Sequence, residues 1–352
     1  MSETAAPAQV HTPVQTEAVI ALLPESTHSS HEFRHAGMGF PSGDGREVIT
    51  VAILAKDKAH SLPVYLKCLE AQTWPKLQTR IYVRTNNNND KTPTILKDWL
   101  ARVGSSYLEV AFDDKDVEKK VERFQQHEWN GERFEVLGTI RNLSMQWAVQ
   151  RGDHYFVADC DNFIAPDTLE CLAKFAFANP EPCVVAPLLW CPKRHYSNFH
   201  SSIDQNGYFK SDELYNKLHS QTIKGLVQLP VVHCTYFVHA KAAAILKYLD
   251  GSGRYEYVIF SHECRRNNVP QYLDTRRVYG RVSFMETAET LAGEFGHSPL
   301  PFVKFDPPAP APAPAPALAL DLAPAPVPEA SPLVSPLAEI KLVETNAESK
   351  HG

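Results

Sequence analysis

The sequence lacks an excess of basic residues. Its 352 residues include 35 Lys and Arg against 41 Asp and Glu, a formal net charge of −6. Residues 1–45 hold one Arg against five acids, residues 301–352 hold three Lys against six, and residues 46–300 hold the remaining 31 basic and 30 acidic residues. Proteins that bind nucleic acid by electrostatics normally carry a basic excess. We therefore expect a nearly neutral core between acidic flanks, and no nucleic-acid partner.

Signals for membranes, secretion and metal-binding cysteines are also missing. No run reaches the ~18 apolar residues of a membrane helix, so we expect no transmembrane segment. Residues 1–6 show no basic start followed by an apolar core, as a signal peptide would. None of the seven cysteines forms a CxxC pair, which disfavours a zinc or redox motif. The expected location is cytoplasmic, with reduced thiols.

Proline is concentrated near one end of the chain. Residues 307–336 contain 11 prolines, many in a Pro-Ala alternation that favours an extended polyproline-like spacer. Residues 1–45 are rich in Ala, Pro, Ser and Thr. The composition predicts a disordered N-terminal segment at 1–45, a folded domain at 46–300 and a disordered Pro/Ala-rich tail at 301–352.

The central region alternates strand-like and helix-like patterns. Apolar runs of strand length occur at 48–55, 79–85, 107–112, 155–158, 184–189 and 231–238. Helical spacing occurs at 62–71, 92–103, 136–150, 166–177 and 256–268. This order predicts an α/β domain with a mixed, mostly parallel sheet flanked by helices. The first strand is not followed by a GxGxxG loop, so a dinucleotide-binding Rossmann domain loses its main support.

An acidic pair, Asp159 and Asp161, directly follows the apolar run at 155–158. Ligands of open parallel sheets bind beyond the carboxyl ends of the strands. Two carboxylates there can hold one hard divalent cation, which keeps waters and takes phosphate oxygens as its other ligands. Such a cation neutralises the charge that develops on a leaving diphosphate. The structural alternative is that Asp161 and Asn162 begin a turn that leads into the next helix.

Seven short motifs extend in order over most of the core: 51–63 (VAILAKDKAHSLP), 85–92 (TNNNNDKT), 159–163 (DCDNF), 185–187 (VAP), 196–199 (YSNF), 207–210 (GYFK) and 230–233 (PVVH). Together they resemble the procollagen galactosyltransferase domains. The fungal mannan-polymerase mannosyltransferases are more distantly similar. The resemblance implies a GT-A-type fold and a Mn²⁺- or Mg²⁺-dependent transfer of a hexose. The implied donor is a nucleotide sugar, UDP-linked, and the acceptor is a hydroxyl of an unidentified protein or glycan.

The resemblance also implies roles for individual residues. Asp159 and Asp161 match the metal-binding pair, and Glu256 matches an acidic residue suited to act as the general base. The donor-binding positions are Ala55, Asp57, Asn88, Asp90 and Arg141, and the sugar- or acceptor-binding positions are Tyr196, Asn198, Phe199 and His233.

Several of these residues also have purely structural interpretations. An Asn-rich run is typical of turns, and Arg141 could form a surface salt bridge. Phe199 and His233 could be core residues. Glu256 could cap a helix, because a helix N-terminus favours a carboxylate.

The sequence departs from the family pattern at two positions. Val278 stands before Tyr279-Gly280, where the family has a histidine that could be a third metal ligand, and valine cannot bind a metal. Either another histidine (His233, His262 or His297) substitutes, or water completes the shell, or the metal site is weakened. Tyr255 replaces the first acid of the family's Asp-Asp segment.

These departures keep two other functions open. One is a catalytically inactive sugar- or nucleotide-binding scaffold module, for which the missing third ligand is the main support. The other is a nucleotidyltransferase, which also holds Mg²⁺ on acids. That class would need a Gly-rich, basic loop after the first strand, whereas residues 55–62 contain no glycine.

Overall fold

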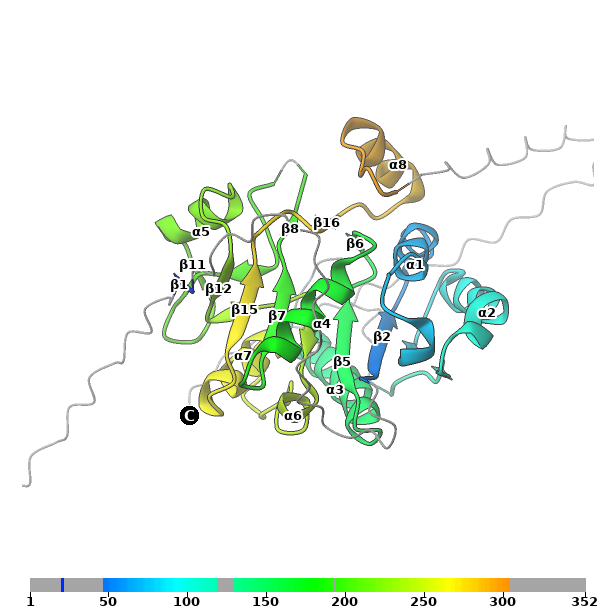
Figure 1. Cartoon of the computed structure of the whole chain (residues 1–352). Coiled ribbons are helices and arrows are strands. Elements are labelled where there is room, and N and C mark those ends of the chain that lie inside the picture. The colour runs from blue at the N-terminus through cyan, green and yellow to red at the C-terminus, as the bar shows by residue number, and fades with distance from the viewer. Residues whose placement is uncertain (1–19, 22–46, 119–129, 193, 304–352) are drawn as a thin grey trace, which may run out of the picture. The chain divides into compact units, whose positions relative to one another are not determined.

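The computed structural model describes residues 20–21, 47–118, 130–192 and 194–303 (Figure 1). The predicted disordered segments, 1–45 and 301–352, lie outside the described residues except at 20–21 and 301–303. Among the helices described, none combines the length and apolarity needed to cross a membrane.

A nine-stranded sheet, counted over the described residues, forms the centre of the domain, in the order β1-β12-β15-β7-β14-β5-β2-β3-β4. Only β12 and β14 run against the direction of the other strands. The predicted α/β class with a mixed, mostly parallel sheet is therefore confirmed. The strands are β1 (Ile20–Ala21), β2 (Ile49–Ala55), β3 (Thr79–Thr85), β4 (Glu109–Asp113), β5 (His154–Ala158), β7 (Val184–Pro187), β12 (Leu226–Gln228), β14 (Thr235–Val238) and β15 (Gln271–Asp274).

Helices cover both faces of this sheet (Figure 1). Side chains of a strand point alternately to its two faces, and β5 shows the consequence. Phe156 and Ala158 belong to one apolar cluster and Tyr155 and Val157 to the other. The first cluster takes in residues of α1 (Leu62–Glu70), α2 (Thr92–Val103), α4 (Thr168–Ala178) and α8 (Ala288–His297). The second takes in residues of α3 (Gly131–Val149), α5 (Glu213–His219), α6 (Ala240–Ala243) and α7 (Glu256–Arg266).

Short strands form three smaller sheets. Their bounds are β6 (Asn162–Ile164), β8 (Leu189–Trp190) and β16 (Gly280–Val282) in one, β9 (Phe199–His200) and β13 (Val231–Val232) in the second, and β10 (Ser202–Ile203) and β11 (Phe209–Lys210) in the third. Two short 3₁₀ helices, Lys76–Gln78 and Gly104–Ser106, precede β3 and β4.

Four predicted elements differ from the structure. The strand predicted at 184–189 is two strands, because β7 ends at Pro187 in the central sheet and β8 begins at Leu189 in a small sheet. The strand predicted at 231–238 is two strands, because the chain leaves the small sheet of β13 and enters the central sheet as β14. Cys234, at this change, has a left-handed backbone with φ of 64°. Helix α3 begins earlier than predicted, because the Asn130 side chain caps it by accepting from the backbone N–H of Arg133. The strand predicted at 107–112 begins later, after the 3₁₀ turn that precedes β4.

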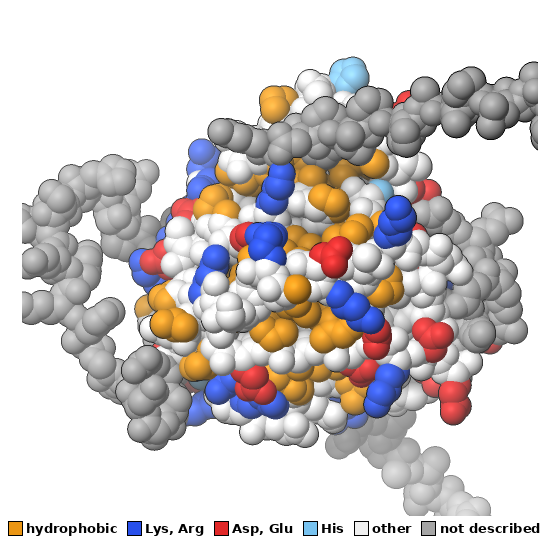
Figure 2. Space-filling view, turned by 90° about the vertical axis from the view of Figure 1, so that its right-hand side faces the viewer, with side chains coloured by type: hydrophobic (Ala, Val, Ile, Leu, Met, Phe, Trp, Pro, Cys, Tyr) orange, Lys and Arg blue, Asp and Glu red, His pale blue; other side chains and the backbone are white. Residues whose placement is uncertain are grey.

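Charges of both signs are mixed on the surface drawn in Figure 2. On this face Lys and Arg side chains lie among Asp, Glu and apolar side chains, and the described part of the face shows no continuous basic patch. This distribution agrees with the nearly equal numbers of basic and acidic residues in the core.

Candidate functional site

The acidic pair lies where three parallel strands end together. β5, β2 and β3 are neighbours in the sheet and run in the same direction. Asp159 immediately follows β5, and its backbone N–H donates to the carbonyl of Cys234 at 3.0 Å. The Asn162 N–H donates back to the Asp159 carbonyl at 2.8 Å, which closes a tight turn. The carboxylates are therefore held at the edge of the sheet where the sequence places them.

Each carboxylate of the pair already has a basic partner. Arg141 Nη2 donates to Asp159 Oδ1 at 2.7 Å, and Lys58 Nζ donates to Asp161 Oδ2 at 2.8 Å. The Asp159 and Asp161 side chains are 30% and 27% exposed. Burial raises the pKa of Asp159, although the Arg141 guanidinium opposes this shift. The second oxygen of each carboxylate makes no hydrogen bond to the described residues, so both can take another ligand.

The donor set suits a hard cation but supplies only two side chains. Carboxylate oxygens are the ligands that Mg²⁺ prefers, and Mn²⁺ accepts them as well. No third His, Cys, Asp or Glu of the described residues joins the pair in a group that could hold a metal. The alternative that His233, His262 or His297 replaces the family's histidine is therefore not supported among the described residues. Val278 packs against the second apolar cluster instead. A metal held here would take water and substrate oxygens for the rest of its shell.

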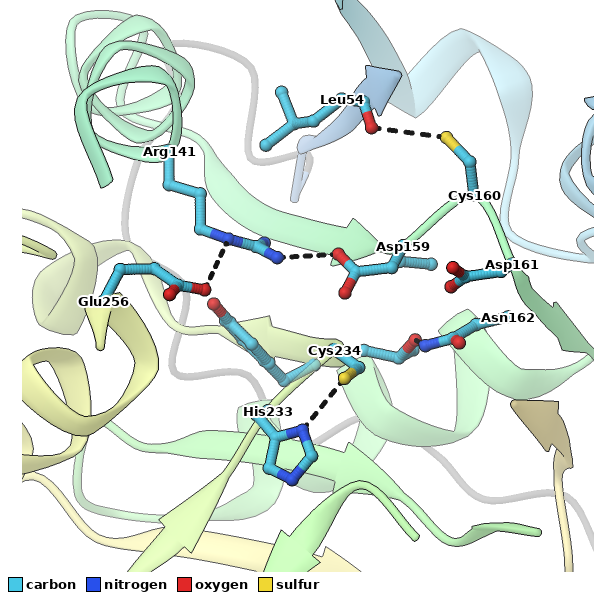
Figure 3. Close-up of polar contacts among 12 residues, drawn as sticks. Leu54, Arg141, Asp159, Cys160, Asp161, Asn162, His233, Cys234 and Glu256 are labelled. Carbon is cyan, nitrogen blue, oxygen red and sulfur yellow. Dashed lines mark hydrogen bonds and ion pairs between the residues drawn. The ribbon is translucent and has the colours of Figure 1, made fainter. Parts of the chain in front are cut away.

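Arg141 is a buried link between two acids. Its side chain is 5% exposed and lies between Asp159 and Glu256, with Nε 3.5 Å from Glu256 Oε1 (Figure 3). The alternative of a surface salt bridge is therefore wrong. One guanidinium therefore contacts both carboxylates, through a hydrogen bond to Asp159 and a longer ion pair to Glu256.

Glu256 is the first residue of α7, as the sequence predicts, and its side chain is 5% exposed. Burial raises its pKa to about 7, against the opposing effect of the Arg141 charge. Its Oε2 is buried and has no hydrogen-bond partner among the described residues. A carboxylate with a pKa near neutrality can both take up and release a proton at physiological pH.

The polar side chains among the predicted donor-binding residues mainly form hydrogen bonds between the segment after β2 and the segment after β3. Asn88 Oδ1 accepts from the Asp57 N–H at 2.9 Å, and Asp57 Oδ1 accepts from the Asn89 N–H at 2.6 Å. Asp90 accepts from the N–H groups of Ala59 and Thr92, each at 2.9 Å. Ala55 is buried at the end of β2. These four residues end or follow β2 and β3, which are parallel neighbours of each other and, through β2, of β5. Their contact with a donor stays a prediction.

Two of the predicted sugar-binding residues are core residues, which corrects that part of the sequence analysis. Asn198 is fully buried, donates to the Pro187 carbonyl at 2.8 Å and accepts from the Leu189 N–H at 3.1 Å. Phe199 is 1% exposed and packs against Tyr215. Strand β9 begins inside the motif at 196–199, and Phe199 packs into the core there.

Tyr196 and His233 remain beside the site. Their ring centroids are 6.0 Å apart, and His233 Nδ1 lies 2.9 Å from Cys234 Sγ (Figure 3). His233 Nε2 is buried without a hydrogen-bond partner in the described part of the chain. Burial lowers the pKa of His233, so the ring is neutral at pH 7.

Asn198→Ala should lower the stability of the fold and leave substrate affinity nearly unchanged. The substitution leaves the buried Pro187 carbonyl and Leu189 N–H without their partner, which costs about 1–3 kcal/mol for each unsatisfied group. Thermal melts and the acceptor KM measure the two effects. Asn206→Ala, on an exposed loop, is the matched control. A raised KM with an unchanged melting temperature would restore Asn198 as a sugar contact.

Sequence reasoning missed two residues of the site. Lys58 belongs to a motif used for the resemblance, but its role was not considered. Its place shortly after β2 puts it at the same edge as the acidic pair, and this spacing could have indicated it. Cys234 lies inside the strand predicted at 231–238, and no feature of the sequence indicates that it belongs to the site.

The comparisons with known proteins agree on one family. A family model described as "Glycosyltransferase family 25, N-terminal domain" matches residues 46–297. Procollagen galactosyltransferase 1 of Danio rerio is 27% identical over 273 residues, which cover 74% of this chain and 44% of the relative. The probable inactive glycosyltransferase 25 family member 3 of Bos taurus is 28% identical over 246 residues, which cover 67% of this chain and 40% of the relative. The chain thus spans less than half the length of these curated relatives.

Solved structures of glycosyltransferases are also similar at low sequence identity. S. aureus TarS 1-349 in complex with UDP-GlcNAc aligns with a TM-score of 0.44 and 14% identity, over 68% of this chain and 59% of that one. The mannosyltransferase PcManGT from Pyrobaculum calidifontis, in complex with GDP-Man and Mn2+, aligns with a TM-score of 0.43 and 15% identity, over 67% and 56% of the two chains.

Proposed function

Because the chain belongs to glycosyltransferase family 25, we propose that it is a metal-dependent hexosyltransferase that uses a nucleotide-sugar donor, preferably UDP-linked, and a hydroxyl acceptor. The observation that supports this most directly is the line of side chains Asp159, Arg141 and Glu256. Asp159 is a carboxylate suited to a metal, and Glu256 is a buried carboxylate suited to proton transfer. The buried guanidinium of Arg141 contacts both.

The charge of the site supports a requirement for a divalent cation. Its side chains joined by ion pairs are three carboxylates, Asp159, Asp161 and Glu256, and two bases, Lys58 and Arg141. With all five ionised, the site is negative and would repel the diphosphate of a donor. A divalent cation on Asp159 and Asp161 would reverse this balance and would supply neutralisation of the leaving diphosphate.

The chain's own residues would position the substrates and accept the proton of the acceptor. Arg141 keeps Asp159 and Glu256 at a constant separation, so the donor and the acceptor hydroxyl meet a preorganised site. Glu256 would accept the proton of the acceptor hydroxyl as that oxygen attacks the sugar. The low exposure of Glu256 limits competition by water.

A donor-hydrolysis panel tests this function without a known acceptor. UDP-galactose, UDP-glucose, UDP-N-acetylglucosamine and GDP-mannose are each incubated with the full chain and Mn²⁺, and the release of nucleotide is measured. We expect slow hydrolysis of a UDP sugar that stops when EDTA removes the metal. Hydrolysis that is unaffected by EDTA would contradict the metal requirement, and no release of nucleotide from any of the four donors would contradict the transferase activity.

A second candidate is a nucleotide-binding module without catalysis. It is favoured by Val278 at the position of the family's histidine and by a metal site with only two protein ligands among the described residues. Titration calorimetry of UDP with and without Mn²⁺, combined with the hydrolysis panel, separates the two. Metal-dependent UDP binding without turnover of any donor or acceptor would favour the binding module.

A further inference from the structure

Lys58 and Arg141 hold the two acids of the pair in different ways. Arg141 is buried and contacts two acids, with a hydrogen bond to Asp159 and a longer ion pair to Glu256. Lys58 is 30% exposed, and within the described part of the chain its ammonium makes one ion pair with a side chain, to Asp161 Oδ2. Arginine suits fixed, forked contacts, whereas lysine is a compact charge on a flexible stem. The Lys58 ammonium can therefore exchange partners, and the Arg141 guanidinium cannot do so without leaving Glu256.

The backbone of Lys58 is anchored, which limits where its ammonium can go. Its N–H donates to Thr92 Oγ1 at 2.7 Å, and its carbonyl accepts from the N–H groups of Ser61 and Leu62 at 3.1 and 3.0 Å. Lys58 thus stays beside the N-terminus of α1 while its side chain turns. Any anion that reaches the acidic pair comes within reach of this ammonium.

A divalent cation on the acidic pair would compete with Lys58. Two positive charges a few ångströms apart repel each other, most strongly where water is partly excluded. A metal that takes Asp161 as a ligand would therefore displace the ammonium from it. The phosphate oxygens of a donor bind the same metal and offer the displaced ammonium a new anionic partner.

We propose that Lys58 is an internal counter-ion of the acidic pair, which exchanges Asp161 for the donor diphosphate when metal and nucleotide bind; this inference rests on the proposed function. Lys58 opposes the binding of the metal alone and supports the binding of the nucleotide with the metal. Metal and donor then favour each other's binding, as thermodynamic linkage requires of two coupled ligands. Lys58 thereby weakens binding of the metal when no donor is bound.

The test replaces Lys58 with Met, which keeps the apolar stem and removes the charge. Mn²⁺ binding to the full chain is measured by electron paramagnetic resonance, and UDP binding at saturating Mn²⁺ by calorimetry. We expect Mn²⁺ alone to bind about 3–10-fold more tightly, because the competing ion pair and its charge are gone. UDP should bind about 10-fold more weakly, through loss of a charge-assisted hydrogen bond. Lys58→Arg, which keeps the charge, should restore UDP binding.

A matched control is Lys97→Met. Lys97 Nζ forms an ion pair with Asp114 Oδ2 at 2.7 Å, on the exposed side of α2, and its loss should change neither binding constant. Lys58→Gln is a second neutral variant in case Lys58→Met melts at a lower temperature.

Two results would overturn the proposal. If the wild-type chain binds Mn²⁺ and UDP, and the neutral variants bind both ligands as the wild type does or bind both more weakly, Lys58 does not exchange partners, and the proposed function stands. If the wild-type chain binds neither ligand, the proposed function fails together with the inference.

Discussion

Asp161→Asn should abolish metal-dependent nucleotide binding and sugar transfer while the fold stays intact. The amide keeps the shape of the side chain but removes the negative charge that a divalent cation needs. Asp161 lies on the surface of the site, 27% exposed, so the change removes one partly exposed ion pair, worth about 1 kcal/mol or less. Thermal shift with Mn²⁺ and UDP measures binding, and circular dichroism checks the fold.

Asp159→Asn should have the same effect on binding and a larger effect on stability. Asp159 is the partner of the buried Arg141, whose charge would keep only the longer contact to Glu256. Asp98→Asn, exposed on α2, controls for the loss of one acid. Turnover retained in both site variants, with an unchanged response to Mn²⁺, would exclude the metal role of the pair.

Glu256→Gln should reduce transfer to the acceptor by roughly 10²–10⁴-fold, the usual contribution of a general base, with donor binding nearly unchanged. The carboxamide keeps the shape of the side chain but cannot accept a proton at neutral pH. If Glu256 only favours the N-terminus of α7, activity stays and stability falls by ~1 kcal/mol or less. A transfer assay combined with a melt separates the two roles. Glu263→Gln, buried on the same helix, is the matched control.

The pH dependence of Glu256→Gln gives a second measurement. Burial raises the pKa of Glu256 from 4.5 to about 7, so the wild-type kcat/KM should rise with pH up to about 7 and then level off. Between these two values the folded state binds more protons than the unfolded state, so this residue makes stability fall as pH rises through that window. Both trends should disappear in the Gln variant. A Gln variant with the wild-type pH profile would assign the rise to another group.

The elements of the central sheet could be predicted because their patterns are local. The apolar runs at 48–55, 79–85 and 155–158 became β2, β3 and β5, and the helical spacing between them became helices on the faces of the sheet. Parallel order then places the carboxyl ends of these strands at one edge. The location of Asp159 and Asp161 at that edge follows from the sequence for the same reason.

Other features depend on where distant segments meet. The break between β13 and β14 arises because the two strands pair in different sheets, with β9 and β5 respectively. The pattern of an apolar run does not indicate which strand each part of it will pair with. The run at 231–238 therefore predicts one continuous strand. Asn198 was misassigned for a related reason. An amide side chain can bind either a ligand or buried backbone groups, and the contacts of Asn198 with the chain between β7 and β8 show the second.

The sequence by itself determined the class of fold, the family-like motifs and the acidic pair, because these rest on periodicity and on neighbours along the chain. Only the tertiary structure decided the electrostatics of the site. The pairing of Lys58 with Asp161 joins residues 103 positions apart, and that of Arg141 with Asp159 brings a helix to a strand end. The raised pKa of Glu256 comes from burial. Distances between charges and exclusion of water are properties of the packed chain, so no local pattern encodes them.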